Sequence, residues 1–123
     1  MTVGEAIQKL DAIKVNAYST AQKVQWLNEK EAEIWQNIIS THANPDHLEF
    51  EPLTEDNMRR TLFADVPYDM LYVYWLQSRV DMANGEISKY NVSAQLFNAQ
   101  YAAFDGYWNR THRPIHKVHA VRL

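Results

Sequence analysis

The chain has 123 residues, of which 46% are hydrophobic and 22% charged, so it suits one compact domain and is too apolar to be disordered. It contains no cysteine, which excludes a disulfide framework, a zinc-thiolate site and thiol catalysis. The longest apolar run, Met70 to Leu76, is far shorter than the roughly 20 residues of a membrane helix, and residues 1–10 lack a signal-peptide pattern. We therefore expect a soluble, non-exported protein without a membrane partner.

The charge is distributed unevenly along the chain. Four of the 12 Lys and Arg residues, and none of the 15 Asp and Glu residues, lie in residues 110–123. This segment therefore carries +4, and residues 1–109, with eight basic and 15 acidic residues, carry −7. An acidic body and a basic tail are electrostatically complementary. We predict two parts, a helical domain over residues 1–109 and a basic C-terminal tail over residues 110–123.

Apolar residues spaced three or four positions apart predict four helices. Ser19 and Gln22 have the spacing of a capping box at the start of the second helix, and Gly85 is a typical stop for the third. Pro67 suits the first turn of the third helix. On the second helix, Glu31 occupies a place in the apolar stripe where an apolar residue is expected. The predicted helices cover about residues 3–14, 20–40, 67–84 and 86–109.

Residues 42–66 show no sustained period and contain two prolines, which predicts a long ordered loop. Loops of this length are typically functional or carry short strands, and Leu48, Phe50 and Leu53 are the expected anchors. Pro114 favours a tail after the last helix that is extended, or disordered until a partner orders it. The predicted fold is all-α: a small four-helix bundle-like domain with one long loop, in which a short β segment is an option, and an extended C-terminal tail.

Fifteen aromatic residues are many for so small an interior, so we expect some rings to face a partner. Trp26, Trp35 and Trp75 are assigned to the core because of their helical context. The fourth helix carries one broad aromatic face, formed by Tyr90, Leu96 or Phe97, Tyr101, Phe104 and Trp108.

Paired carboxylates offer the main enzymatic interpretation. Glu29 and Glu33 are one turn apart, as are Asp65 and Asp69, a spacing found in all-helical magnesium-dependent nucleotide hydrolases. However, Glu29 and Glu33 lie off the apolar stripe with Lys30 between them, as on a solvated face. No nucleophile elbow or glycine-rich phosphate loop is present. We expect no enzyme, no small-molecule substrate and no cofactor, with the hydrolase kept as an alternative.

Histidines 112, 116 and 119 have a spacing that could present zinc ligands on one helix face, but Pro114 interrupts that helix. The basic tail instead predicts binding to an acidic protein surface or to nucleic acid phosphates. The charge of −7 on residues 1–109 argues against a free DNA-binding protein. Trp and Arg are enriched at interface hot spots. The predicted contact residues are Arg59, Arg60, Trp108, Arg110, His112, Arg113, Lys117 and Arg122.

Several short strings occur along the chain in a distinctive order: Phe50–Thr54, Val66–Asp69, Asp81–Glu86, Tyr90–Ser93, Leu96–Asn98 and Tyr107–His112 followed by Pro114, with Lys23 and Trp26-Leu27 before them. Together they resemble a family of small proteins encoded in the structural gene blocks of tailed phages and prophages of Gram-positive bacteria, the head-tail connector or head-completion adaptor group. The resemblance covers about residues 19–114.

This resemblance implies a structural virion-assembly protein, a helical adaptor that forms a ring at the portal vertex and joins the capsid to the neck and tail. The implied partners are further copies of the chain, the portal protein and the next neck or tail component, with the basic residues as candidates for contact with packaged DNA. The implied location is the virion neck, after synthesis in the cytoplasm of the bacterial host. The residues alone leave open a small helical nucleic-acid-binding or protein-binding module that uses the basic tail.

Overall fold

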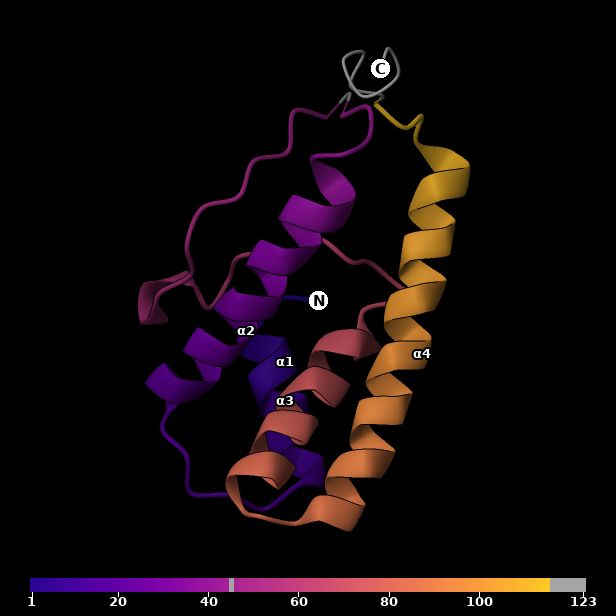
Figure 1. Ribbon diagram of the computed structural model, residues 1–123. Helices are drawn as coiled ribbons and strands as arrows, with labels where there is room; N and C mark the ends of the chain where they lie inside the picture. Colours follow the sequence, from indigo (N-terminus) through magenta and orange to yellow (C-terminus); the bar gives the residue numbers. More distant parts are fainter. Residues whose placement is uncertain (45, 116–123) are drawn as a thin grey trace, which may run out of the picture.

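Four α-helices form the body of the protein in a computed structural model that describes residues 1–44 and 46–115 (Figure 1). A π-helical turn extends α2, and a 3-10 turn lies in the long loop. Within these residues the only β pairing consists of two isolated bridges, Thr2 with Thr61 and His42 with Pro114. The all-α prediction is confirmed. The elements are α1 (Val3–Ile13), α2 (Thr20–Ile34), the π-helical turn (Trp35–Ile39), the 3-10 turn (Glu55–Asn57), α3 (Met70–Ala83) and α4 (Ile87–Thr111).

The helices α3 and α4 lie side by side and antiparallel, joined by a short turn at the lower end of the view (Figure 1). Gly85 makes this turn with a φ of +73°, a conformation that side chains with a Cβ rarely adopt, so the predicted stop is confirmed. The run from Met70 to Leu76 is helical although it is rich in strand formers. Tyr72 from α3 and Phe104 from α4 are the largest fully buried side chains.

The N-terminal caps of α1 and α2 are made by hydroxyl side chains. Ser19 Oγ accepts a hydrogen bond from Gln22 N at 3.1 Å, so the predicted N-cap is confirmed, but this is only one half of the predicted capping box. Thr2 and Glu5 form a full capping box at the start of α1. The predicted helix to Ser40 continues past Ile34 as the π-helical turn, in which Ser40 N donates to Trp35 O at 2.9 Å.

Backbone hydrogen bonds join the long loop to the first residues of α1. Val3 N donates to Arg60 O at 3.0 Å and Gly4 N donates to Met58 O at 2.9 Å, so the loop accepts from N–H groups that have no partner within the helix. Leu53 is buried, as predicted, but so are Leu62 and Ala64, which the sequence did not single out. Leu48 packs partly on the core.

Three helix predictions are corrected by the packing. Pro67 lies in a turn over residues 66–69, and α3 begins only at Met70. The helix α4 continues through Arg110 to Thr111, two residues beyond its predicted end at about residue 109. Ile13 is 55% exposed although it continues the apolar stripe of α1, because the stripe extends beyond the surface that the other helices cover.

Lys30 is buried, contrary to the prediction that it lies on a solvated face with Glu29 and Glu33. Its Nζ lies 4.1 Å from the centre of the Trp75 ring and 4.7 Å from that of Phe97, and 2.8 Å from a Glu33 oxygen. Aromatic faces attract a cation, and the aliphatic stem of a lysine packs well on rings. Lys30 therefore links α2 to α3 and α4.

All 15 aromatic side chains are buried or half-buried. Phe97, rather than Leu96, faces the core, and Leu96 is 43% exposed on the outside of α4. Trp26, Trp35 and Trp75 are half-buried and pack against the core, in line with their assignment. The many rings therefore surround a small core in tilted pairs, and no aromatic side chain is fully exposed.

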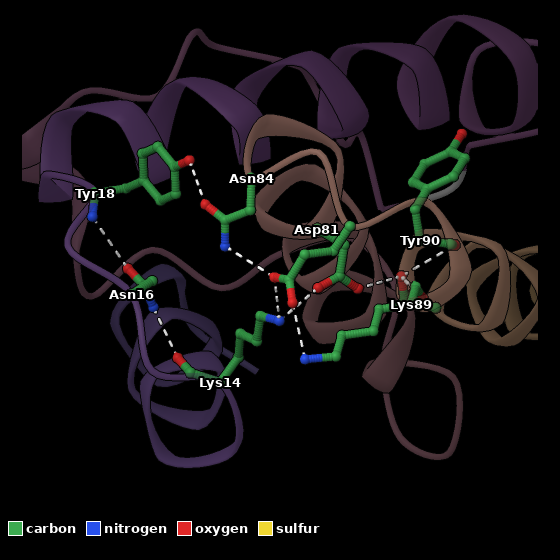
Figure 2. Close-up of polar contacts among 9 residues, drawn as sticks. Lys14, Asn16, Tyr18, Asp81, Asn84, Lys89 and Tyr90 are labelled. Carbon is green, nitrogen blue, oxygen red and sulfur yellow. Dashed lines mark hydrogen bonds and ion pairs between the residues drawn. The ribbon is translucent and has the colours of Figure 1, made fainter.

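A polar network closes the end of the bundle where α1 ends and α3 turns into α4 (Figure 2). Asp81 is 1% exposed, and one of its oxygens lies 2.9 Å from Lys14 Nζ while the other accepts from Ser93 Oγ at 2.9 Å. Lys14 also lies 2.9 Å from a Glu86 oxygen, and Glu86 lies 2.8 Å from Lys89. Hydrogen bonds from Lys89, Lys14 and Asn84 lower the pKa of Glu86 to about 2.

Replacing Lys14 tests this network. Lys14→Ala leaves Asp81 as a buried carboxylate without its cation, which we expect to lower the free energy of unfolding by roughly 3–5 kcal/mol in urea denaturation at neutral pH. The matched control is Lys9→Ala, which removes an exposed lysine from the same helix and should change stability by less than about 0.5 kcal/mol. Equal effects of the two substitutions would contradict a structural role for the network.

Candidate functional site

A groove of about 540 Å³ lies between the long loop and the C-terminal end of α4. We call it the acidic groove. Leu48, Phe50, Leu62 and Phe63 from the loop and Tyr107 and Trp108 from α4 form its apolar walls. Five carboxylates are set among these walls. The acidic residues that line the groove are Glu31, Asp46, Glu49, Glu51 and Asp65, and its remaining lining residues are Arg60, Thr61 and His112.

The carboxylates outnumber the cations in the acidic groove. Arg60 is the one Lys or Arg among the lining residues, and it lies 3.6 Å from a Glu51 oxygen and donates to the Glu51 carbonyl. No ion pair engages Asp46, Glu49 or Asp65 within residues 1–44 and 46–115. These three side chains are exposed. The groove is therefore a negatively charged surface with an apolar interior, open to a cationic ligand.

Glu31 is the buried carboxylate of the groove, and both of its oxygens are engaged. Tyr72 OH donates to Oε1 at 2.6 Å and Phe63 N donates to Oε2 at 2.7 Å. The Tyr72 hydroxyl in turn accepts from Ala64 N at 2.9 Å. Burial raises the pKa of Glu31 to about 7, although these hydrogen bonds act in the opposite direction. Glu31 thus has a structural task, which is to hold residues 63–64 between α2 and α3.

The C-terminal end of α4 is fixed by His42, a buried residue at the end of the α2 segment. His42 Nδ1 lies 2.7 Å from Ile38 O, and its Nε2 contacts the Asn109 side chain. Beyond the helix, Arg113 O accepts from Ala43 N at 2.7 Å and Ile115 N donates to Thr41 O at 2.8 Å. Residues 113–115 are therefore extended, as predicted, and are paired with residues 41–43.

The structure brings three of the predicted contact residues, Arg60, Trp108 and His112, to the acidic groove. Trp108 is only 8% exposed and its ring stacks on His112 with a centroid distance of 3.7 Å, so most of the indole packs in the core although the residue also lines the groove. The other described candidates, Arg59, Arg110 and Arg113, are exposed and do not line the groove. Lys117 and Arg122 lie outside the described residues, as do His116 and His119.

The carboxylate pairs weighed for a metal site are not gathered in one place. Glu29 is exposed, Glu33 is engaged by Lys30, and Asp69 is largely buried at the start of α3. In the part of the chain that the structure describes, no group of three or more His, Asp or Glu residues is arranged to hold a metal ion. No helix there is long and apolar enough to cross a bilayer.

Sequence reasoning missed the roles of two residues in this region. Glu31 stood out as a charged residue in an apolar stripe, and that irregularity is a signal for a buried carboxylate with partners. His42 carried no such signal, because its partner Asn109 is 67 residues away in the chain.

Comparisons of the chain with protein-family models, with curated proteins and with solved structures found no match.

The raised pKa of Glu31 predicts a pH dependence of stability. An ordinary glutamate in the unfolded chain titrates near pH 4.5, so between about pH 4.5 and 7 the folded state binds a proton that the unfolded state has released. Stability should therefore fall as the pH rises through this range, by up to about 3 kcal/mol from Glu31, and its contribution should be constant above it. Glu86, whose pKa is lowered to about 2, acts in the opposite direction and only below about pH 4.5.

Urea denaturation at a series of pH values from 5 to 8, in the wild type and in Glu31→Gln, measures this contribution. The amide does not titrate, so Glu31→Gln should remove the fall in stability over this range. Glu29→Gln is the matched control, because Glu29 is an exposed glutamate of the same helix. If both variants keep the wild-type slope, Glu31 does not titrate as described.

Proposed function

We propose that this chain is a structural subunit that binds other protein subunits and catalyses no reaction. The observation that carries this proposal is the outer face of α4. Val92, Leu96, Ala99 and Ala103 follow one another at intervals of four, three and four residues, so they form one stripe along the helix. All four are exposed, Val92 at 59% and Leu96 at 43%. We call these four residues the α4 stripe.

The composition of α4 supports an interface on this side. No charged residue occurs from Tyr90 to Phe104, and the 25 residues of α4 include only Lys89, Asp105 and Arg110 as charged residues. By contrast, α2 has five charged residues among 15, of which Glu29 and Glu33 are exposed. The outer face of a solvated helix is normally charged, whereas the centres of protein interfaces are depleted of charge. Small side chains such as Ala99 and Ala103 also allow a second helix to approach closely.

The resemblance to head-tail connectors of tailed phages supplies the particular form of the proposal. In that form the chain assembles as a ring at the portal vertex, contacts the portal protein and the next neck or tail component, and acts in the virion neck. Such a ring needs two different surfaces on each subunit, one that binds the preceding copy and one that binds the next. The α4 stripe and the acidic groove share no residue, which supports this arrangement.

Charged substitutions in the α4 stripe test the proposal. Val92→Asp combined with Leu96→Asp should weaken self-association or binding to the cognate portal assembly by at least about tenfold in dissociation constant, since each aspartate would be buried without a partner. Sedimentation velocity over a range of concentrations, with and without the portal assembly, provides the measurement.

The matched control is Asn91→Asp combined with Asn98→Asp, which adds the same charge to exposed positions of α4 outside the stripe. This variant should associate like the wild type. A wild type that stays monomeric at every concentration and does not bind the portal assembly would overturn the proposal. So would equal association of the stripe variant and its control, with helix content by circular dichroism showing that both are folded.

A further inference from the structure

The acidic groove has both the charge and the apolar walls that a basic, partly aliphatic peptide needs. Asp46, Glu49 and Asp65 are exposed on it and have no ion-pair partner among the described residues. Leu48 and Phe50 lie in the same wall of the groove as Asp46 and Glu49. The exposed carboxylates would therefore pair with positive charges of a partner at the rim of the groove. The apolar walls of the groove would bury the partner's apolar side chains.

A second observation at the groove concerns Trp108, which lines it and is more than nine-tenths buried. Its indole Nε1 is a buried donor without an acceptor in residues 1–44 and 46–115. Leaving such a donor unsatisfied is unfavourable. The wall of the groove therefore includes a hydrogen-bond donor that no described acceptor satisfies.

The sequence of the chain contains a segment of matching chemistry. Residues 116–123 read His-Lys-Val-His-Ala-Val-Arg-Leu, with two cations, two histidines, three large aliphatic side chains and no acid. They lie outside the described residues, so only their sequence enters the argument. Their two charges, Lys117 and Arg122, are complementary to the unpaired carboxylates of the groove.

The path of the chain favours the groove of a second copy over its own. Residues 113–115 run antiparallel to residues 41–43, because Arg113 O is bonded to Ala43 N and Ile115 N to Thr41 O. Residues 113–115 therefore lie beside residue 43 first and beside residue 41 next. The part of the long loop that lines the groove begins at Asp46, which follows residue 43 in the opposite direction. At Ile115 the chain therefore runs toward Thr41 and not toward Asp46. Eight further residues can extend by at most about 26 Å, a reach that suits an adjacent subunit.

We infer that the acidic groove of one subunit binds residues 116–123 of a second copy of this chain. The inference rests on the proposed function, since it names one of the two contacts by which copies associate. The interaction is head to tail: each copy offers one groove and one basic segment, and a series of such contacts closes into a ring when the rotation between copies allows it.

A charge-swap experiment on the full chain tests the inference. Lys117→Glu with Arg122→Glu reverses the charge of the basic segment, and Asp46→Lys with Glu49→Lys reverses the charge of two groove positions. Each pair alone should weaken self-association at least about tenfold, and a chain that carries all four substitutions should recover it. Glu29→Lys with Glu55→Lys changes the net charge as the groove variant does, at exposed positions outside the groove, and should have no effect. Sedimentation velocity at low and high salt measures the self-association of the wild type and of these four variants.

A direct binding measurement complements the charge swap. The chain with Lys117→Glu and Arg122→Glu keeps an intact groove, so it should bind a fluorescent peptide with the sequence of residues 113–123, as followed by anisotropy. The groove variant should bind this peptide at least about tenfold more weakly.

The outcomes separate this inference from the proposed function. If the charge swaps leave association unchanged while the α4 stripe variant weakens it, the inference is overturned and the proposed function stands. A second outcome also overturns the inference and assigns the segment to nucleic acid. In that outcome, charge reversal at residues 117 and 122 abolishes binding to a short random-sequence DNA duplex, while the groove substitutions change neither self-association nor peptide binding. Restoration in the combined variant supports the inference.

Discussion

The buried hydrogen-bonded unit of Glu31, Tyr72 and residues 63–64 is the constraint on which the rest of the structure depends. A carboxylate in an apolar interior is costly unless hydrogen bonds satisfy it, and here two donors from different parts of the chain do so. The Tyr72 hydroxyl also accepts a hydrogen bond from Ala64 N, so the same unit fixes the position of residue 64. Because three segments converge on this unit, the loop that follows α2 takes one path, and one wall of the acidic groove is formed.

The ends of the bundle are closed by polar contacts of different kinds. At one end, Lys14 neutralises the buried Asp81 and connects it to Glu86 at the turn before α4. At the other end, His42 connects the end of the α2 segment to the last turn of α4 through Asn109. The helix α4 is thus held at both ends and packs along α3, and no charged residue occurs on it from Tyr90 to Phe104.

The two proposed contacts differ in physical character and would give an assembling subunit two kinds of control. An apolar stripe buries surface without regard to ionic strength, whereas the contact between an acidic groove and a basic segment weakens as salt screens it. A neck component of the connector type has to associate with more than one neighbour. Distinct surfaces of different character allow each association to be made without competition from the other.

Much of the local structure could be predicted from the sequence. Periodic apolar residues, the hydroxyl cap at Ser19 and the stop at Gly85 act over three or four residues, so a single stretch of sequence contains all that determines them. The overall charge pattern, acidic in the body and basic after residue 109, is likewise a property of the sequence alone. Of the contact residues named from the sequence, Arg60 and His112 line the groove.

The exposure of particular side chains and the groove itself were decided by tertiary structure. Ile13 and Leu96 continue apolar patterns but lie where no other element covers them, and Lys30 interrupts a polar face but is covered by Trp75 and Phe97. Glu31 finds Tyr72 across 41 residues, and His42 finds Asn109 across 67. Such pairs form only after the helices have packed, because nothing in the local sequence of either partner specifies the other.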